Sequence, residues 1–186
     1  MPEKLDFITP TLMSVFGLFL EDPMQEYHER EVIRRTGVSK GSANKILRML
    51  ADLDFLIRER KGRMVFYKLD TEEPAVRQLK ILSNIFMLRK LLSQLKRHSK
   101  KIVLFGSCAQ GTDVKESDID MLVLASEKSE KSAVREIISE FNQRNKRKIV
   151  PIVIDTNEFV ELEREDKPLY ENIERGIVLW KMVEAE

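Results

Sequence analysis

Two aspartates, Asp118 and Asp120, are the residues of this chain whose type and spacing best suit chemistry. They stand two positions apart at the start of a strand-like apolar run, Ile119–Leu124, and residues i and i+2 of a strand project from the same face. Their carboxylates are therefore expected to lie side by side, where a cation between them relieves the repulsion of like charges. Hard oxygen ligands of this kind suit Mg²⁺ or Mn²⁺. The spacing predicts a divalent metal site.

A glycine-serine pair, Gly106-Ser107, supplies the complement to these acids. It follows the short apolar run Ile102–Phe105 and precedes the aspartates along the chain. Glycine lets the backbone turn tightly and approach a ligand, and if Ser107–Gln110 is the first turn of a helix, its free N–H groups point at an anion. A triphosphate would fit between the turn and the carboxylates. This combination is typical of metal-assisted transfer of a nucleotidyl or phosphoryl group.

The same residues carry a family resemblance. Gly106-Ser107 followed by Ser117–Val123, between two apolar strands, resembles the signature of the DNA polymerase beta-like nucleotidyltransferase superfamily, and is most similar to its small prokaryotic minimal domains. The resemblance implies that Gly106 and Ser107 bind the phosphates of an NTP, with ATP expected. It also implies that Asp118 and Asp120 ligate the catalytic Mg²⁺ (or Mn²⁺) and that NMP passes to an unidentified acceptor. The alternative is a surface loop with a solvated acidic strand end.

Two positions depart from the pattern of this family. Relatives usually carry a third carboxylate on the strand that corresponds to Ile149–Ile154, and the register aligns that position with Val150. Asp155, at the end of the strand, is a possible substitute for this acid, but strand parity places it on the face opposite Val150 unless Pro151 produces a bulge. Many relatives also carry a triphosphate-binding arginine near Gln110. These departures affect the expectation of turnover more than that of nucleotide binding.

The first part of the chain has the pattern of a winged helix-turn-helix domain. Apolar residues at helical spacing predict a helix from Pro10 to Leu20 and two more over Glu29–Arg35 and Lys40–Leu53. Two strand-like runs, Phe55–Ile57 and Met64–Leu69, then enclose a basic turn that contains glycine, which predicts a hairpin. This order resembles the DNA-binding domains of small prokaryotic regulators.

Basic residues gather on the third predicted helix and on the hairpin. The outer face of that helix carries no acid before Asp52, and it has the amide and cationic side chains that read base edges and hold phosphates. We expect double-stranded DNA to be a partner. The expected DNA-binding residues are Lys40, Ser42, Asn44, Lys45, Arg48, Arg58, Arg60, Lys61 and Arg63. Winged-helix folds also serve as protein-interaction or dimerisation modules, and a basic face is often merely solvated.

The remaining periodicities predict an α+β chain with a mixed sheet flanked by helices in its second half. We expect a winged-helix domain over residues 1–72, a connecting helix within 73–100 and a nucleotidyltransferase-like domain over 101–186. The apolar positions of the connecting helix suit a homodimer seam and packing on either domain equally well. After the central motif we expect helices at 131–144, 156–162 with Thr156 as its cap, and 168–174, and strands at 149–154 and 177–182.

Composition limits the setting of the protein. The formal net charge of the 186 residues is +1, so any argument for nucleic acid must rest on local patches. Cys108 is the one cysteine, which excludes an internal disulfide and suits a reducing cytoplasm. The start of the chain lacks the pattern of a signal peptide, and the longest nearly apolar run, Leu12–Leu20, is far shorter than the roughly 20 residues that span a bilayer. We therefore expect a soluble cytoplasmic protein with no membrane partner.

Two functional hypotheses from different classes follow. The first is a Mg²⁺-dependent nucleotidyltransferase coupled to a DNA-binding winged-helix domain. The second is a DNA-binding transcriptional regulator whose nucleotidyltransferase-like domain binds nucleotide or acts as a scaffold without turnover.

Overall fold

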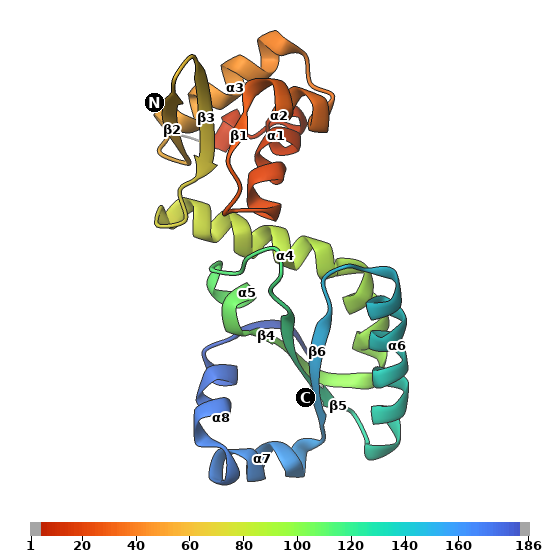
Figure 1. Cartoon of the computed structure of the whole chain (residues 1–186). Helices are drawn as coiled ribbons and strands as arrows, with labels where there is room; N and C mark the ends of the chain where they lie inside the picture. The colour runs from red at the N-terminus through yellow and green to blue at the C-terminus, as the bar shows by residue number, and fades with distance from the viewer. Residues whose placement is uncertain (1–4, 183–186) are drawn as a thin grey trace. The chain divides into compact units, whose positions relative to one another are not determined.

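The computed structural model describes residues 5–182 of the chain, which fall into two compact units, Met1–Leu79 and Lys80–Glu186 (Figure 1). The residues Met1–Lys4, at the start of the segment that lacks a signal-peptide pattern, lie outside the described part. The fold class is α+β as predicted, with a winged helix-turn-helix in the first unit and a mixed sheet flanked by helices in the second.

The first unit packs three helices against a small antiparallel sheet. Its strands run in the order β1-β3-β2, and β2 and β3 form the hairpin of the wing. Its elements are η1 (Leu5–Phe7), α1 (Pro10–Glu21), β1 (Tyr27–His28), α2 (Glu29–Thr36), α3 (Lys40–Asp52), β2 (Leu56–Lys61) and β3 (Met64–Leu69).

Local sequence sets the helix boundaries of this unit. The Thr9 hydroxyl accepts a hydrogen bond from the Leu12 N–H at 3.2 Å, and the Ser39 hydroxyl accepts one from the Ser42 N–H at 3.3 Å, so both satisfy donors that a helix start leaves unpaired. Gly37, with φ 70°, ends α2 in the left-handed conformation and turns the chain towards α3. The predicted helices are therefore confirmed to within a residue or two.

The hairpin differs in one respect from its prediction. Strand β2 extends to Lys61, so Arg58 and Arg60 lie within the strand and only Gly62 and Arg63 form the turn. Cross-strand pairs such as Arg60 with Val65 continue the ladder through what was predicted to be a loop. Backbone hydrogen bonding to the neighbouring strand stabilises the extended form of a charged segment that has no strand pattern of its own.

The second unit is built on a mixed sheet of four strands in the order β6-β5-β4-β7. The β5–β6 pair is parallel, whereas β4 pairs antiparallel with both β5 and β7. Helix α4 (Pro74–Leu95) begins before the boundary of the unit and continues into it. The other elements are η2 (Lys96–His98), β4 (Ser99–Phe105), α5 (Gly106–Gln110), β5 (Ile119–Ala125), η3 (Lys128–Glu130), α6 (Lys131–Arg144), β6 (Ile149–Ile154), α7 (Thr156–Glu165), α8 (Lys167–Glu174) and β7 (Ile177–Lys181).

Helices cover both faces of this sheet. On one face, α4 and α6 contribute side chains such as Leu92 and Ile138 to a core with Ile102 and Met121 of the sheet. On the other face, α7 and α8 contribute side chains such as Phe159 and Ile173. Figure 1 shows α6 on one side of the strands and α7 and α8 on the other. Strand alternation therefore sends Asp120, two residues before the buried Leu122, to the face that α7 and α8 partly cover.

The caps of α7 and α8 correct one prediction. Asp155, not Thr156, is the N-cap of α7, and it forms a capping box with Glu158. Asp166 likewise caps α8, which begins at Lys167. A carboxylate at the N-terminus of a helix is favoured by the helix dipole as well as by its hydrogen bonds.

Between residues 5 and 182, no helix has the length and apolar character needed to cross a membrane.

Gly176 offers a test of the packing between α8 and the sheet. A Cβ at this position would lie 2.6 Å from the Leu104 carbonyl oxygen and 2.7 Å from Val103 Cγ1, so we expect Gly176→Ala to lower the free energy of unfolding by about 1–3 kcal/mol. The control is Gly41→Ala in α3, where a Cβ meets nothing within 4 Å. Chemical denaturation should show the control unchanged or slightly stabilised, and equal losses in both variants would contradict the packing.

Candidate functional site

The carboxylate of Asp120 lies against the turn that connects β4 to α5. Phe105, the last residue of β4, pairs with Asp120 across the antiparallel ladder. Gly106 follows with φ 66°, and a Cβ at this position would overlap Asp120 Oδ2 and lie 3.2 Å from its Cγ. Both the left-handed backbone and the space that the carboxylate occupies therefore require glycine here.

Asp118 lies immediately before β5 and is exposed, whereas Asp120 is the second residue of the strand and is partly buried. Burial raises the pKa of Asp120, and the negative charge of Asp118 raises it further. The charge of Asp118 therefore acts on the Asp120 carboxyl. Two neighbouring carboxylates are a donor set that fits Mg²⁺, which takes its remaining ligands from water and substrate phosphates. Within residues 5–182 no cluster of three or more His, Cys, Asp or Glu could hold a metal by itself.

The turn also presents Ser107 and the short helix α5. The helix ends at Gly111, which has φ 68°, and the Ser107 carbonyl accepts hydrogen bonds from the backbone of this C-terminal turn, including one from the Thr112 N–H at 3.1 Å. Gln110, at the position near which the family often has arginine, is exposed and offers no positive charge. The structure therefore brings Gly106, Ser107 and Asp120 together at one end of the β4–β5 pair, next to Asp118.

A buried polar network contacts the loop that carries Asp118, and none of the predictions from sequence included it. Lys80, Asn84 and Asp113 are 3%, 6% and 3% exposed. The Lys80 ammonium donates to the Asp113 carbonyl at 2.6 Å, and the Asn84 amide donates to Asp113 Oδ1 at 3.0 Å and to the Cys108 carbonyl at 3.1 Å. Helix α4 is thereby tied to the end of α5 and to the loop.

Arg147, in the turn before β6, completes this network. Its guanidinium donates to the Ser117 carbonyl at 3.2 Å and to Asn84 Oδ1 at 3.2 Å, and it lies 3.1 Å from Asp113 Oδ2. It also donates to the Cys108 sulfur at 2.9 Å. The bond to the Ser117 carbonyl holds the residue that precedes Asp118, so the network helps to position the loop that carries this acid.

Burial governs the protonation of this network. It lowers the pKa of Lys80, an effect that the charge of Asp113 opposes. It raises the pKa of the Cys108 thiol to about 11, against the opposing influence of Arg147. The thiol is therefore protonated at neutral pH, and a protonated thiol is not a nucleophile.

A sequence signal for the network existed in α4. Val76, Lys80, Asn84 and Leu88 recur at four-residue intervals and lie on one buried face of the helix. Two polar residues within a buried stripe require partners. The sequence does not reveal which residues those partners are.

The position of the expected third carboxylate is occupied by Val150. Strand β6 pairs with β5 in unbroken register, with Val150 opposite Asp120 and Pro151 opposite Met121, so Pro151 produces no bulge. Val150 is 47% exposed. Asp155 is engaged elsewhere, because it caps α7 and accepts a hydrogen bond from the Lys131 ammonium at 2.8 Å. That bond is the main reason the pKa of Asp155 is lowered.

The expected DNA-binding residues lie on α3 and the wing. Lys40, Lys45 and Arg48 of α3 are exposed, as are the four cations of the wing, Arg58, Arg60, Lys61 and Arg63. Two members of the set have protein partners. The Asn44 amide donates to Glu29 of α2 at 2.6 Å, and Lys61 forms ion pairs with Glu26 and Glu59. Ser42 is partly buried and its N–H donates to the Ser39 hydroxyl.

Residues 87–184, more than half of the chain, match the family model described as polymerase beta, nucleotidyltransferase. The chain therefore belongs to this family, and its second unit is a nucleotidyltransferase-type domain. No curated protein sequence matches the chain significantly.

Solved structures give weaker similarities. One is a toxin–antitoxin with AMP-PNP, at 26% identity and TM-score 0.39, which covers 53% of this chain and 74% of that one. A putative nucleotidyltransferase from Sulfolobus solfataricus has 15% identity and TM-score 0.37, over 59% and 90% of the two chains. BpsR of Bordetella bronchiseptica, whose DNA binding is regulated by 6-hydroxynicotinic acid, has 12% identity and TM-score 0.36, over 77% and 79%.

Gly106→Ala tests the contact between the turn and Asp120. The added methyl group displaces the Asp120 carboxylate, so we expect Mg²⁺-dependent nucleotide binding to fall at least tenfold, together with about 1–2 kcal/mol of backbone strain. The matched control is Gly62→Ala, which has nearly the same φ of 63° but open space around a Cβ. Calorimetric titration of both variants checks this, and equal nucleotide affinity would contradict the role of the contact.

Proposed function

We propose that the protein is a Mg²⁺-dependent nucleotidyltransferase that uses an NTP, ATP above all, as donor. The observation that carries the proposal is the Asp120 carboxylate packed against Gly106, with Asp118 close enough to affect its pKa. Membership of the nucleotidyltransferase family supports it. The arrangement gathers two acids and a phosphate-sized turn at one end of the sheet.

Each residue of the site has a distinct role in this proposal. Gly106 supplies the left-handed turn and the space that the Asp120 carboxylate occupies, and the Ser107 hydroxyl donates to a phosphate oxygen. Asp118 and Asp120 would hold a divalent ion, which would polarise the phosphates and neutralise charge during transfer. An acceptor oxygen forms a bond to the α-phosphorus while the bond from that phosphorus to the bridging oxygen breaks, and pyrophosphate leaves with that electron pair. Where the acceptor is a hydroxyl group, its proton passes to water. The buried network around Asp113 and Arg147 keeps the loop in the geometry that this requires.

Asp118→Asn and Asp120→Asn test the assignment of the two acids. Each change removes one negative ligand and keeps the shape of the side chain, so we expect at least a tenfold loss of Mg²⁺-dependent ATP affinity and loss of nucleotide transfer. Glu116→Gln is the matched control, because Glu116 is an exposed acid of the same loop. Calorimetry with and without Mg²⁺ measures the affinity, and nucleotide labelling that survives both aspartate changes would remove the assignment.

A DNA-binding role for the first unit is the second candidate function. It is favoured by exposed cations on α3 and the wing, of which Lys40, Lys45, Arg48, Arg60 and Arg63 have no carboxylate at ion-pair distance within the described part of the chain. Unneutralised cations on a helix face and a hairpin match the charge of a duplex backbone. A regulator whose second unit binds nucleotide without turnover would use the same surface. Both functions can reside in one chain.

Lys45→Ala and Arg60→Ala test this surface. Each change removes a cation that has no carboxylate partner, so we expect the affinity for duplex DNA to fall several-fold. The slope of log K against log salt concentration should become shallower by about one unit for each phosphate contact that is lost. Lys61→Ala is the internal control, because Glu26 and Glu59 already neutralise that ammonium, and it should weaken binding less. A mobility-shift titration at several salt concentrations measures both the DNA affinity and its salt dependence. Equal effects of all three changes would contradict a specific surface, and no binding at low salt would exclude the role.

A further inference from the structure

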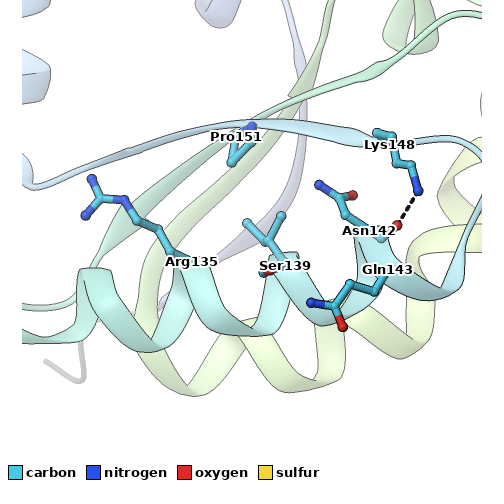
Figure 2. A pocket seen from close by; sticks show the side chains of 7 residues that line it. Arg135, Ser139, Asn142, Gln143, Lys148 and Pro151 are labelled. Carbon is cyan, nitrogen blue, oxygen red and sulfur yellow. Dashed lines mark hydrogen bonds between the residues drawn. The ribbon is translucent and has the colours of Figure 1, made fainter.

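An uncharged residue stands opposite Asp120 in the sheet. Val150 pairs with Asp120 in the parallel ladder of β5 and β6 and is 47% exposed. Pro151, the next residue, lines a groove against α6 together with Arg135 and Lys148 (Figure 2). Successive side chains of a strand point to opposite faces, so Val150 projects away from that groove, on the face that it shares with Asp120. The β6 side of the acids is therefore an apolar group in contact with solvent.

The packing of the neighbouring residues supports this assignment of the faces. Ile152 and Leu122 pair with each other two residues further along the same strands, and both pack with side chains of α7 and α8. Met121 belongs instead to the core on the side of α4 and α6. Asp120 and Val150 therefore lie on the α7 and α8 face of the sheet.

The nearby acids do not replace the carboxylate that Val150 lacks. Asp155 follows the last residue of β6 and accepts a hydrogen bond from the Lys131 ammonium at 2.8 Å. Asp113 is 3% exposed and accepts a hydrogen bond from the Asn84 amide at 3.0 Å. In the part of the chain from residue 5 to residue 182, no three His, Cys, Asp or Glu residues form a group that could hold a metal. The acids of the site are thus limited to a pair.

A pair of carboxylates matches the charge of one divalent ion. Mg²⁺ takes one or two carboxylates and completes its shell with water and phosphate oxygens, so Asp118, Asp120 and an NTP suffice for one ion. Paired catalytic ions stand about 3.5–4 Å apart, where two double charges repel each other strongly. A second ion therefore needs a further anionic ligand from the protein, and the position beside Asp120 that could supply one holds Val150.

We propose that Val150 limits the site to one divalent ion, bound together with the NTP. This inference rests on the proposed function. It also explains how Val150 slows transfer to a hydroxyl group. The hydroxyl oxygen forms a bond to the α-phosphorus, the bond from that phosphorus to the bridging oxygen breaks, and pyrophosphate leaves with that electron pair. A carboxylate at position 150 would accept the hydroxyl proton, whereas beside valine that proton must pass to water.

Counting the ions bound to the full-length protein provides a readout apart from turnover. The probe is Mn²⁺, measured by electron paramagnetic resonance with and without α,β-methylene-ATP, which cannot be cleaved at the α-phosphorus. We expect the nucleotide to bring one Mn²⁺ to the unchanged protein and to Val150→Asn, and two to Val150→Asp. Val178→Asp is the matched control, because Val178 is 50% exposed but pairs with Val103 and not with an acid. This control should still bind one ion.

The ion counts separate failure of the inference from failure of the proposed function. Two nucleotide-dependent ions in the unchanged protein would overturn the inference and leave the proposed function intact. A single ion in both Val150→Asp and Val150→Glu, with nucleotide affinity retained, would overturn the role of Val150. If the nucleotide brings no ion to the unchanged protein, the proposed function itself is removed.

Hydrolysis of ATP to AMP and pyrophosphate tests the effect of Val150 on the acceptor. Water is the acceptor in this reaction, so no acceptor-binding site is needed. With Mg²⁺ present, we expect Val150→Asp to form AMP at least tenfold faster than the unchanged protein, and Val150→Asn and Val178→Asp to show no increase. Equal rates in the unchanged protein and in Val150→Asp would contradict the inference.

Discussion

The contact between the Asp120 carboxylate and Gly106 is the constraint on which the site depends. It arises from the register of two adjacent strands. Phe105 pairs with Asp120, so the chain turns at Gly106, directly against the carboxylate. A left-handed backbone and the absence of a Cβ are both needed at that point. Any shift of β4 against β5 by one residue would send Asp120 to the opposite face of the sheet. The apolar packing of these central strands therefore sets the geometry of the acids.

Buried polar groups extend that control to the loop before β5. Hydrogen bonds and ion pairs connect α4, the loop before β5 and the turn before β6 through Lys80, Asn84, Asp113 and Arg147. Burying such charges is costly, and a hydrophobic cluster of the same volume is often at least as stabilising. What a polar cluster adds is a specific arrangement, because each donor is satisfied in only one geometry. In this protein the arrangement holds the loop that carries Asp118, at Asp113 and Ser117.

The two units have separate cores. The core of the first unit contains Phe16, Leu47 and Leu50, and the larger of the two core clusters of the second contains Ile102, Met121 and Val123. The cationic surface of α3 and the wing is thus supported independently of the acids on β5.

The sequence by itself determined much of this architecture. Helical and strand periodicities gave the positions of the helices and strands to within a few residues, and the spacing of Gly106-Ser107, Asp118 and Asp120 indicated a common site. Such features are local, because helix caps, strand alternation and tight turns depend on residues a few positions apart.

Only the tertiary structure decided which distant groups meet. The sequence did not indicate that the Asn44 amide donates to Glu29. Nor did it show that Asp155, the possible substitute acid, caps α7 and accepts a hydrogen bond from Lys131. The partners of Lys80 and Asn84 lie about 24 to 63 residues away in the chain. Contacts of that kind depend on sheet register and helix packing, which the pattern of a single segment does not encode.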